Sequence, residues 1–154
     1  MRRIVILLIL CVIATGFCFG QLPHTFTQYT SEDGLSQNTI MSILQDDKGV
    51  MWFATWDGLY KFDGYTFNNY KAHPGDSIGL SNNRLDNIKE DRYGYIWVQS
   101  YNHQVYRFNP RLERFQAIPY DNYLSLDMYV LPCGDVWIIT VQNELIHIST
   151  HPET

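Results

Sequence analysis

One short motif, a glycine followed three residues later by a tryptophan, occurs three times in this chain. It begins at Gly49, Gly94 and Gly134, so the spacings are 45 and 40 residues. A turn signal comes before each apolar run that holds the tryptophan, and a second turn and a short alternating run follow it. This order is typical of β-hairpins. Self-similarity at such a period predicts a propeller or a solenoid, and hairpin elements favour the propeller.

Each repeat resolves into strand candidates that would form one antiparallel blade. We expect four strands in blade 1 (residues 36–72), four in blade 2 (81–119) and three in an incomplete blade 3 (125–149). The expected strands are 40–45, 50–55, 59–63 and 65–70, then 85–89, 95–100, 104–109 and 114–118, and finally 128–131, 136–140 and 144–149. The fold class is therefore all-β, a partial β-propeller of about three four-stranded blades whose third blade is incomplete.

The repeated tryptophans are expected to pack in the core between blades. The runs around them are apolar at nearly every position, whereas a half-exposed strand would alternate. Stacking on a sugar ring is the alternative role for such indoles. We take the following residues as the structural core of the repeat: Trp52, Trp97, Trp137, Gly49, Gly94 and Gly134.

Residues 26–30 form an alternating run with no repeat in front of it. Comparable runs, such as the one that begins at Phe67, come at the end of a repeat. We therefore expect 26–30 to be the last strand of a blade whose other strands lie elsewhere, as when an N-terminal strand closes a propeller ring.

The first 20 residues have the features of a signal peptide, and 21–154 are assigned to the propeller. Arg2 and Arg3 precede an apolar run of eleven residues, and small residues lie before Gln21, so we expect a helical signal segment cleaved near residue 20. An uncleaved anchor is the alternative. Cys133 is then the single cysteine of the exported chain, so no intrachain disulfide is expected.

Charge and residue spacing argue against several classes of function. The formal net charge is −5 and no basic run occurs, so nucleic acid is not an expected partner. The five histidines match no metal-ligand spacing, and nothing predicts a cofactor. Paired acids such as Asp46-Asp47 recur at one repeat position, which favours turn chemistry over glycoside hydrolysis.

The repeat resembles the two-component regulator propeller repeat. The residues that carry the resemblance in the first unit are Gly34, Leu35, Ser36, Asn38, Ile40, Asp46, Gly49, Trp52, Thr55, Gly58, Leu59, Phe62, Asp63, Gly64 and Phe67. The second unit keeps Gly79-Leu80-Ser81, Asn83, Asp91, Gly94 and Trp97, but His103-Gln104 replaces Gly-Leu and adds one residue. In the third unit, Tyr123-Leu124-Ser125 is the expected counterpart of the Gly-Leu-Ser segment.

The resemblance implies a periplasmic sensor of a hybrid two-component histidine kinase, with signal transduction and no catalysis in this chain. It further implies a ligand derived from polysaccharide breakdown, a homodimeric parent receptor, and attachment to the inner membrane through a downstream helix. On this interpretation the chain is a fragment that ends within a blade, and its open strand edge at 144–149 should cause association. A free-standing secreted propeller that binds glycan or protein, and a propeller lyase or hydrolase, are the alternatives.

The candidate ligand contacts are polar and aromatic residues in the turns that follow the tryptophan strands, where the repeats differ. An aromatic face beside a polar side chain suits a sugar ring, and a nearby arginine suits an acidic sugar. The candidates are Trp56, Asp57, Tyr101, Asn102, His103 and Arg84.

Overall fold

The structure is a computed structural model that describes residues 25–36, 39–72, 75, 79–119 and 124–150. The expected signal segment, residues 1–20, lies outside these ranges. The described residues form eleven strands and one 3-10 helix, η1 (Ser31–Asp33). No helix in the described ranges has the length and apolarity that a membrane crossing requires.

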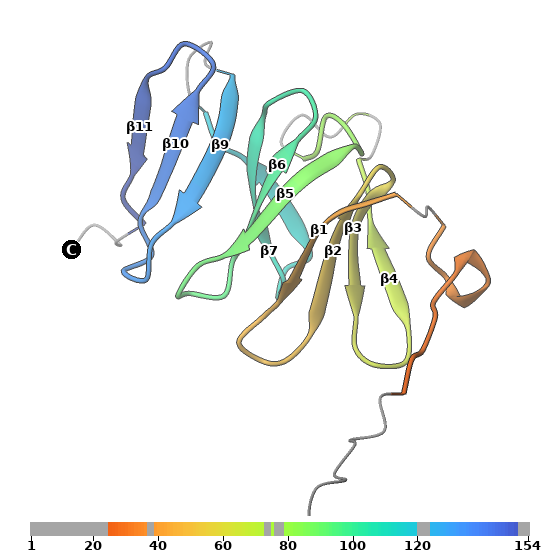
Figure 1. The fold of residues 1–154 in the computed structure, drawn as a ribbon. Helices are drawn as coiled ribbons and strands as arrows, with labels where there is room; N and C mark the ends of the chain where they lie inside the picture. Colours follow the sequence, from red (N-terminus) through yellow and green to blue (C-terminus); the bar gives the residue numbers. More distant parts are fainter. Residues whose placement is uncertain (1–24, 37–38, 73–74, 76–78, 120–123, 151–154) are drawn as a thin grey trace, which may run out of the picture.

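The strands form three antiparallel sheets, in which each strand pairs with its neighbour in sequence (Figure 1). Blade 1 contains β1 (Ile40–Gln45), β2 (Met51–Thr55), β3 (Gly58–Phe62) and β4 (Phe67–Tyr70). Blade 2 contains β5 (Leu85–Glu90), β6 (Ile96–Ser100), β7 (Val105–Asn109) and β8 (Arg114–Ala117). Blade 3 contains β9 (Ser125–Val130), β10 (Val136–Thr140) and β11 (Leu145–Ile148). The expected all-β class and antiparallel blades are confirmed.

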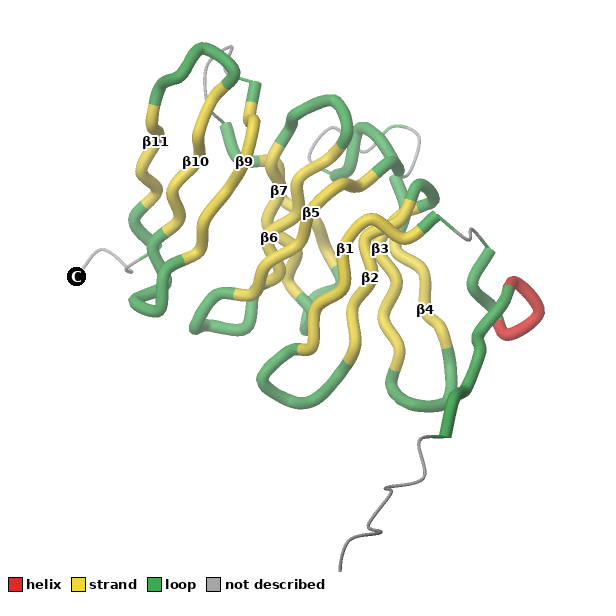
Figure 2. The backbone as a smooth tube through the Cα atoms, viewed as in Figure 1, coloured by secondary structure: helices red, strands yellow, loops and turns green. Residues whose placement is uncertain are grey.

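The sheets stand side by side like the blades of a fan, and their first strands β1, β5 and β9 are neighbours (Figure 2). We call the end of the blades that carries the turns after β2, β6 and β10 the upper rim, as it lies in Figure 1. The opposite end, with the turns that precede these strands, is the lower rim. Residues of the upper rim therefore come together from different blades.

The lower-rim turn explains why glycine recurs before each tryptophan. In blade 1 the Asp46 carboxylate accepts hydrogen bonds from the backbone N–H groups of Lys48 and Val50, at 3.0 and 2.8 Å. Gly49 then adopts φ +82°, a left-handed conformation that side chains disfavour. The same turn returns at Gly94 and Gly134 with φ of +78° and +99°.

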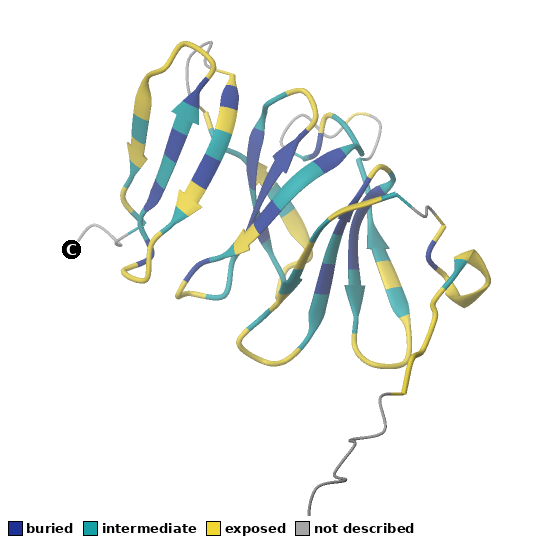
Figure 3. Ribbon diagram, in the orientation of Figure 1, coloured by how far each residue is buried: buried dark blue, intermediate teal, exposed yellow. Residues whose placement is uncertain are grey.

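The core lies between the blades, as the dark blue residues of Figure 3 indicate. Trp52 points from blade 1 toward blade 2, with its ring centroid 5.6 Å from that of Phe108. Trp97 packs against blade 3 in a cluster with Met128. Trp52 and Trp97 are 1% and 0% exposed.

Trp137 differs from the other two repeated tryptophans. It is half-buried and stacks on His147, with ring centroids 4.5 Å apart. Trp52 and Trp97 each point toward the blade that follows their own. Trp137 occupies the same repeat position, but no described residues form a blade beside it, so its ring stays partly exposed.

Two parts of the expected organisation need correction. Residues 26–30 form no strand; instead Tyr29 packs edge-on against Phe62 and Phe67 of blade 1. A segment forms a strand only when it pairs with the edge of a sheet. Residues 26–30 form no strand because no described segment pairs with them. Closure of a ring by these residues stays a proposal.

The second correction concerns Ser125, the expected counterpart of Ser81. Ser125 starts β9 and pairs with Thr140, just as Leu85 pairs with Ser100. Ser125 is therefore the counterpart of Leu85, and β9 begins three residues before its expected start. The Gly-Leu-Ser match fails in the third unit because the 40-residue spacing places Pro119 opposite Gly79.

Candidate functional site

Three side chains from two blades meet on the upper rim where blades 1 and 2 adjoin. The backbone positions them through equivalent bonds: the Tyr101 N–H donates to the Arg84 carbonyl at 2.8 Å, and the Trp56 N–H donates to the Thr39 carbonyl at 3.4 Å. Trp56 and Tyr101 thus occupy one repeat position in the turns after β2 and β6. Arg84, which immediately precedes β5, lies between these two turns.

The Arg84 guanidinium is held between two aromatic faces. Its Cζ lies 4.3 Å from the ring centroid of Trp56 and 4.0 Å from that of Tyr101. The rings are 41% and 53% exposed, while the Arg84 Nε is buried and has no hydrogen-bond partner among the described residues. We call Trp56, Arg84 and Tyr101 the Arg84 clamp. Such stacking contributes about 0.5–2 kcal/mol per ring and restricts the rotamers of the arginine.

Asp86 and His103 lie next to the clamp. Burial raises the pKa of the Asp86 carboxyl above its usual value, and the nearby charges of Arg84 and His103 reduce this effect without cancelling it. Ring atom Nδ1 of His103 lies 2.9 Å from the Ser125 carbonyl, and the Ser125 hydroxyl donates to the His103 carbonyl at 2.7 Å. His103 therefore joins blade 2 to blade 3.

No motif in the sequence marks Asp86. The register of β5 on β6 shifts between Leu85 and Asn87, which leaves Asp86 as a bulge residue on an inner strand. The shifts in β1 and β9 leave Met41 and Leu126 at the same position, where both are exposed. A carboxylate where the other units carry apolar residues is the signal that could have identified it, since bulges often re-aim side chains at functional sites.

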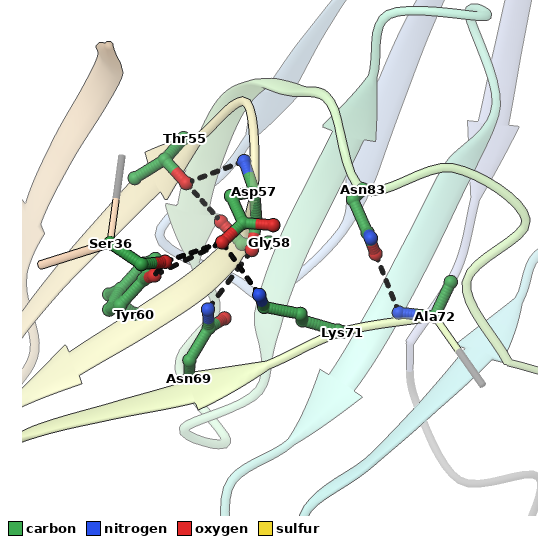
Figure 4. A network of polar contacts seen from close by, with 9 residues as sticks. All are labelled: Ser36, Thr55, Asp57, Gly58, Tyr60, Asn69, Lys71, Ala72 and Asn83. Carbon is green, nitrogen blue, oxygen red and sulfur yellow. Dashed lines mark hydrogen bonds and ion pairs between the residues drawn. The ribbon is translucent and has the colours of Figure 1, made fainter. Parts of the chain in front are cut away.

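Asp57, one of the expected ligand contacts, is occupied by contacts within blade 1 (Figure 4). Its Oδ2 accepts from Lys71 Nζ at 2.6 Å and from the Ser36 hydroxyl at 2.5 Å, and Ser36 also contacts the Tyr60 hydroxyl. Burial would raise the pKa of Asp57, but the hydrogen bonds from Lys71 and Ser36 lower it below its usual value.

The counterpart of Asp57 in blade 2, Asn102, has a matching environment. Its Nδ2 donates to the Ser81 Oγ at 3.2 Å, and that oxygen lies 2.7 Å from the Tyr106 hydroxyl. The repetition of this serine–tyrosine contact in both units indicates that Asp57 and Asn102 brace their turns. Of the expected ligand contacts, the structure brings Trp56, Arg84 and Tyr101 together and places His103 near them. Asp57 and Asn102 instead form hydrogen bonds within their own blades.

One acid of each pair is bonded to the tryptophan of its own unit. Asp46 accepts a hydrogen bond from the Trp52 indole at 2.9 Å, and Asp91 accepts one from the Trp97 indole at 2.8 Å. Both carboxylates also cap their own turns. Among the described residues no three His, Cys, Asp or Glu side chains gather as metal ligands would.

Comparison with known proteins identifies the repeat. Residues 34–57 match the family model described as the two component regulator propeller. Histidine kinase P4 of Formosa agariphila is 48% identical over 56 residues, which are 36% of this chain and 4% of that protein. The chain thus spans a small part of that relative.

Solved structures support the fold. The extracellular domain of the hybrid two-component system BT3049 from B. thetaiotaomicron superposes with a TM-score of 0.65 at 23% identity, over 82% of this chain and 20% of that one. The corresponding domain of BT4673 gives a TM-score of 0.58 at 20% identity, over 73% and 18% of the two chains. These comparisons show a two-component regulator propeller repeat at residues 34–57 and, over most of the described chain, the fold of a β-propeller segment.

Proposed function

We propose that this chain is the ligand-sensing propeller segment of a periplasmic hybrid two-component sensor histidine kinase. In this proposal the Arg84 clamp binds the acidic group of an oligosaccharide released by polysaccharide breakdown. The chain contributes binding surface and no catalysis, and the signal passes through a homodimeric parent receptor with a membrane helix and a kinase.

The observation that carries this proposal is the position of Arg84 between the rings of Trp56 and Tyr101. A guanidinium held by its two faces keeps its edge N–H groups for a ligand, and that edge matches a planar carboxylate with two parallel hydrogen bonds. The exposed parts of the two rings offer apolar surface for the C–H face of a sugar. Because the rings come from blades 1 and 2, a ligand bound here contacts both blades.

The comparisons support the class of protein in which this site is proposed. The matched repeat is described as a regulator propeller, the curated relative is named a histidine kinase, and the structural neighbours are extracellular domains of hybrid two-component systems. An exported location follows from the same proposal.

A binding experiment with one acidic and one neutral oligosaccharide tests the role of the clamp. The probes are tetragalacturonate and a neutral tetrasaccharide of galactose, measured by calorimetry and by the fluorescence of the partly exposed Trp56. We expect the acidic probe to bind more tightly than the neutral one, and Arg84→Gln to weaken that binding about 10-fold or more. Lys89→Gln, which removes one exposed charge outside the clamp, serves as the matched control and should change it less than 2-fold.

The same experiment separates the alternatives. Equal binding of both probes, or an unchanged affinity in Arg84→Gln, would contradict the proposed role of the clamp. Cleavage of tetragalacturonate that is lost in Asp86→Asn would favour a lyase or hydrolase. The DNA that follows the codon of Thr154 separates a sensor receptor from a free-standing propeller. A kinase encoded in the same reading frame would support the receptor, and a stop codon with a stable secreted product would support the free-standing propeller.

A further inference from the structure

The lower rim carries a cluster of cations that lies at the opposite end of the blades from the Arg84 clamp. Two adjoining pockets, of about 110 and 380 Å³, share Tyr95 and Asn109 in their linings. Lys48 and Arg111 line the smaller pocket, and Arg107 and Arg114 line the larger. We call these four cations and the two shared residues the lower-rim cluster.

No run of basic residues marks this cluster in the sequence, which is why the sequence suggested no basic patch. Lys48 comes from the turn between β1 and β2 of blade 1. Arg111 lies in the turn between β7 and β8 of blade 2, and Arg107 and Arg114 lie on those two strands. Only the fold brings them together, at the junction of two blades.

The cations of the cluster lack counter-charges in a chain whose formal net charge is −5. No carboxylate among the described residues lies within 4.0 Å of any of the four, since the ion pairs found there are Lys71–Asp57 and His147–Asp135. Nearby acids have other partners: Glu113 accepts from the Tyr70 hydroxyl at 2.9 Å, and Glu90 accepts from the Asp47 N–H at 3.0 Å. Like charges gathered without partners raise the free energy of the folded chain, and a bound anion would lower it.

Two further contacts prepare the site. Arg107 stacks over Tyr95, 4.6 Å from Cζ to the ring centroid, and donates to Gln116 Oε1 at 3.0 Å, so its guanidinium is held in place. The Asn109 Oδ1 accepts the N–H groups of Arg111 and Leu112 at 2.9 and 3.2 Å. This bonding fixes the turn that presents Arg111 and leaves the Asn109 amide donors for a ligand.

The donors also indicate the shape of the anion. A lysine ammonium acts as a point charge, whereas the guanidinium of Arg84 presents a single planar edge. The two cations around the smaller pocket, Lys48 and Arg111, come from separate turns and therefore approach it from different directions. Donors from several directions suit a tetrahedral oxyanion better than a planar carboxylate. The larger pocket adds Leu112 and Phe115 to Tyr95, which gives apolar surface for the ring that would carry the anion.

We propose that the lower-rim cluster binds a sugar that carries a tetrahedral oxyanion, a sulfate or phosphate ester, with the ester group held by Lys48 and Arg111. The sugar ring packs in the larger pocket near Tyr95 and Phe115. This site is independent of the Arg84 clamp and recognises a different anion.

Calorimetric titration of the chain with four probes tests this proposal. The probes are galactose 6-sulfate, galactose 6-phosphate, galacturonate and galactose. We expect at least one ester to bind about 10-fold more tightly than galacturonate and galactose, and the stronger of the two esters identifies the source of the oxyanion. Arg111→Gln and Lys48→Gln, both at exposed positions, should each weaken that binding about 5-fold or more.

Two matched variants keep the test specific. Lys89→Gln removes one positive charge elsewhere on blade 2 and should change ester binding less than 2-fold. Arg84→Gln should also change ester binding less than 2-fold, because the clamp lies on the upper rim. Equal affinity for galactose and both esters would overturn the proposal, as would equal losses in Lys89→Gln and Arg111→Gln. A loss in Arg84→Gln without a loss in Arg111→Gln would assign the ester to the clamp and likewise overturn it.

Discussion

The Trp97 indole donates a 2.8 Å hydrogen bond to the Asp91 carboxylate, and both residues are buried. Trp52 and Asp46 repeat this relationship at 2.9 Å. In each pair one carboxylate oxygen accepts the indole N–H while the other accepts backbone N–H groups of the turn before the strand. One acidic residue thus couples the turn on the lower rim to the core side chain of its blade.

Replacement of Asp91 should therefore destabilise the fold. Asp91→Ala leaves the Trp97 indole and the N–H groups of Tyr93 and Tyr95 without their acceptor, at a cost of about 3 kcal/mol or more in the free energy of unfolding. Urea unfolding followed by tryptophan fluorescence measures it. Asp47→Ala, the same change at an exposed turn position, should cost less than about 1 kcal/mol. Equal effects of the two variants would argue against the coupling.

The two environments of the repeated tryptophans predict unequal costs of truncation. Trp52→Ala should cost about 3–5 kcal/mol, because Trp52 fills the space between blades 1 and 2. Trp137→Ala should cost well under half as much, since Trp137 is half-buried and stacks on one side, on His147. The free energies of unfolding of both variants check this, and a near-neutral Trp52→Ala would show that Trp52 is not a core residue.

Asp86 predicts a pH dependence with a defined sign. Its pKa is raised in the folded state, mainly by burial, so its contribution to stability is present below its unfolded pKa, about 3.9, and is lost as pH rises through the folded value. Asp86→Asn should therefore unfold at a higher temperature than the native chain at pH 7, and the difference should vanish near pH 3.5. Thermal unfolding across this range tests the prediction, and a variant less stable than the native chain at pH 7 would contradict it.

The outer face of β1 predicts association of the isolated chain. Ile43 is 60% exposed, whereas its counterparts Ile88 and Met128 are each 1% exposed because they pack against the preceding blade. We expect self-association that grows with concentration, and Ile43→Ser should reduce it. Sedimentation velocity measures the effect, with the exposed Tyr65→Ser as control. A native chain that stays monomeric at every concentration would contradict the expectation.

Much of the fold could be predicted from one periodic signal. The glycine and tryptophan of each unit place the second strand, and the turn residues around it place the first and third strands to within one or two residues. The prediction was less accurate at β9, whose start lacks a motif such as Gly79-Leu80-Ser81. At 26–30 the described residues form no strand, because pairing of that stretch depends on a sheet edge that no local pattern reveals.

The candidate site was predictable in its residues but not in its arrangement. Trp56 and Tyr101 stand out as aromatic residues in turns where the repeats differ, and Arg84 stands out by its charge. Their meeting depends on the packing of blade 1 against blade 2, which lies beyond local patterns. Asp86 could not be identified from the sequence, because alternation of apolar and polar residues does not reveal a bulge. The lower-rim cluster could not be identified because its cations come from separate turns and strands.

The most direct test of this repeat architecture is hydrogen exchange of the four indole N–H groups, followed by NMR of the chain labelled with 15N at tryptophan. We expect slow exchange for Trp52 and Trp97, whose indoles are buried and bonded to Asp46 and Asp91, and fast exchange for Trp56 and Trp137. Similar exchange rates for all four indoles, or protection of Trp56 above Trp97, would contradict it.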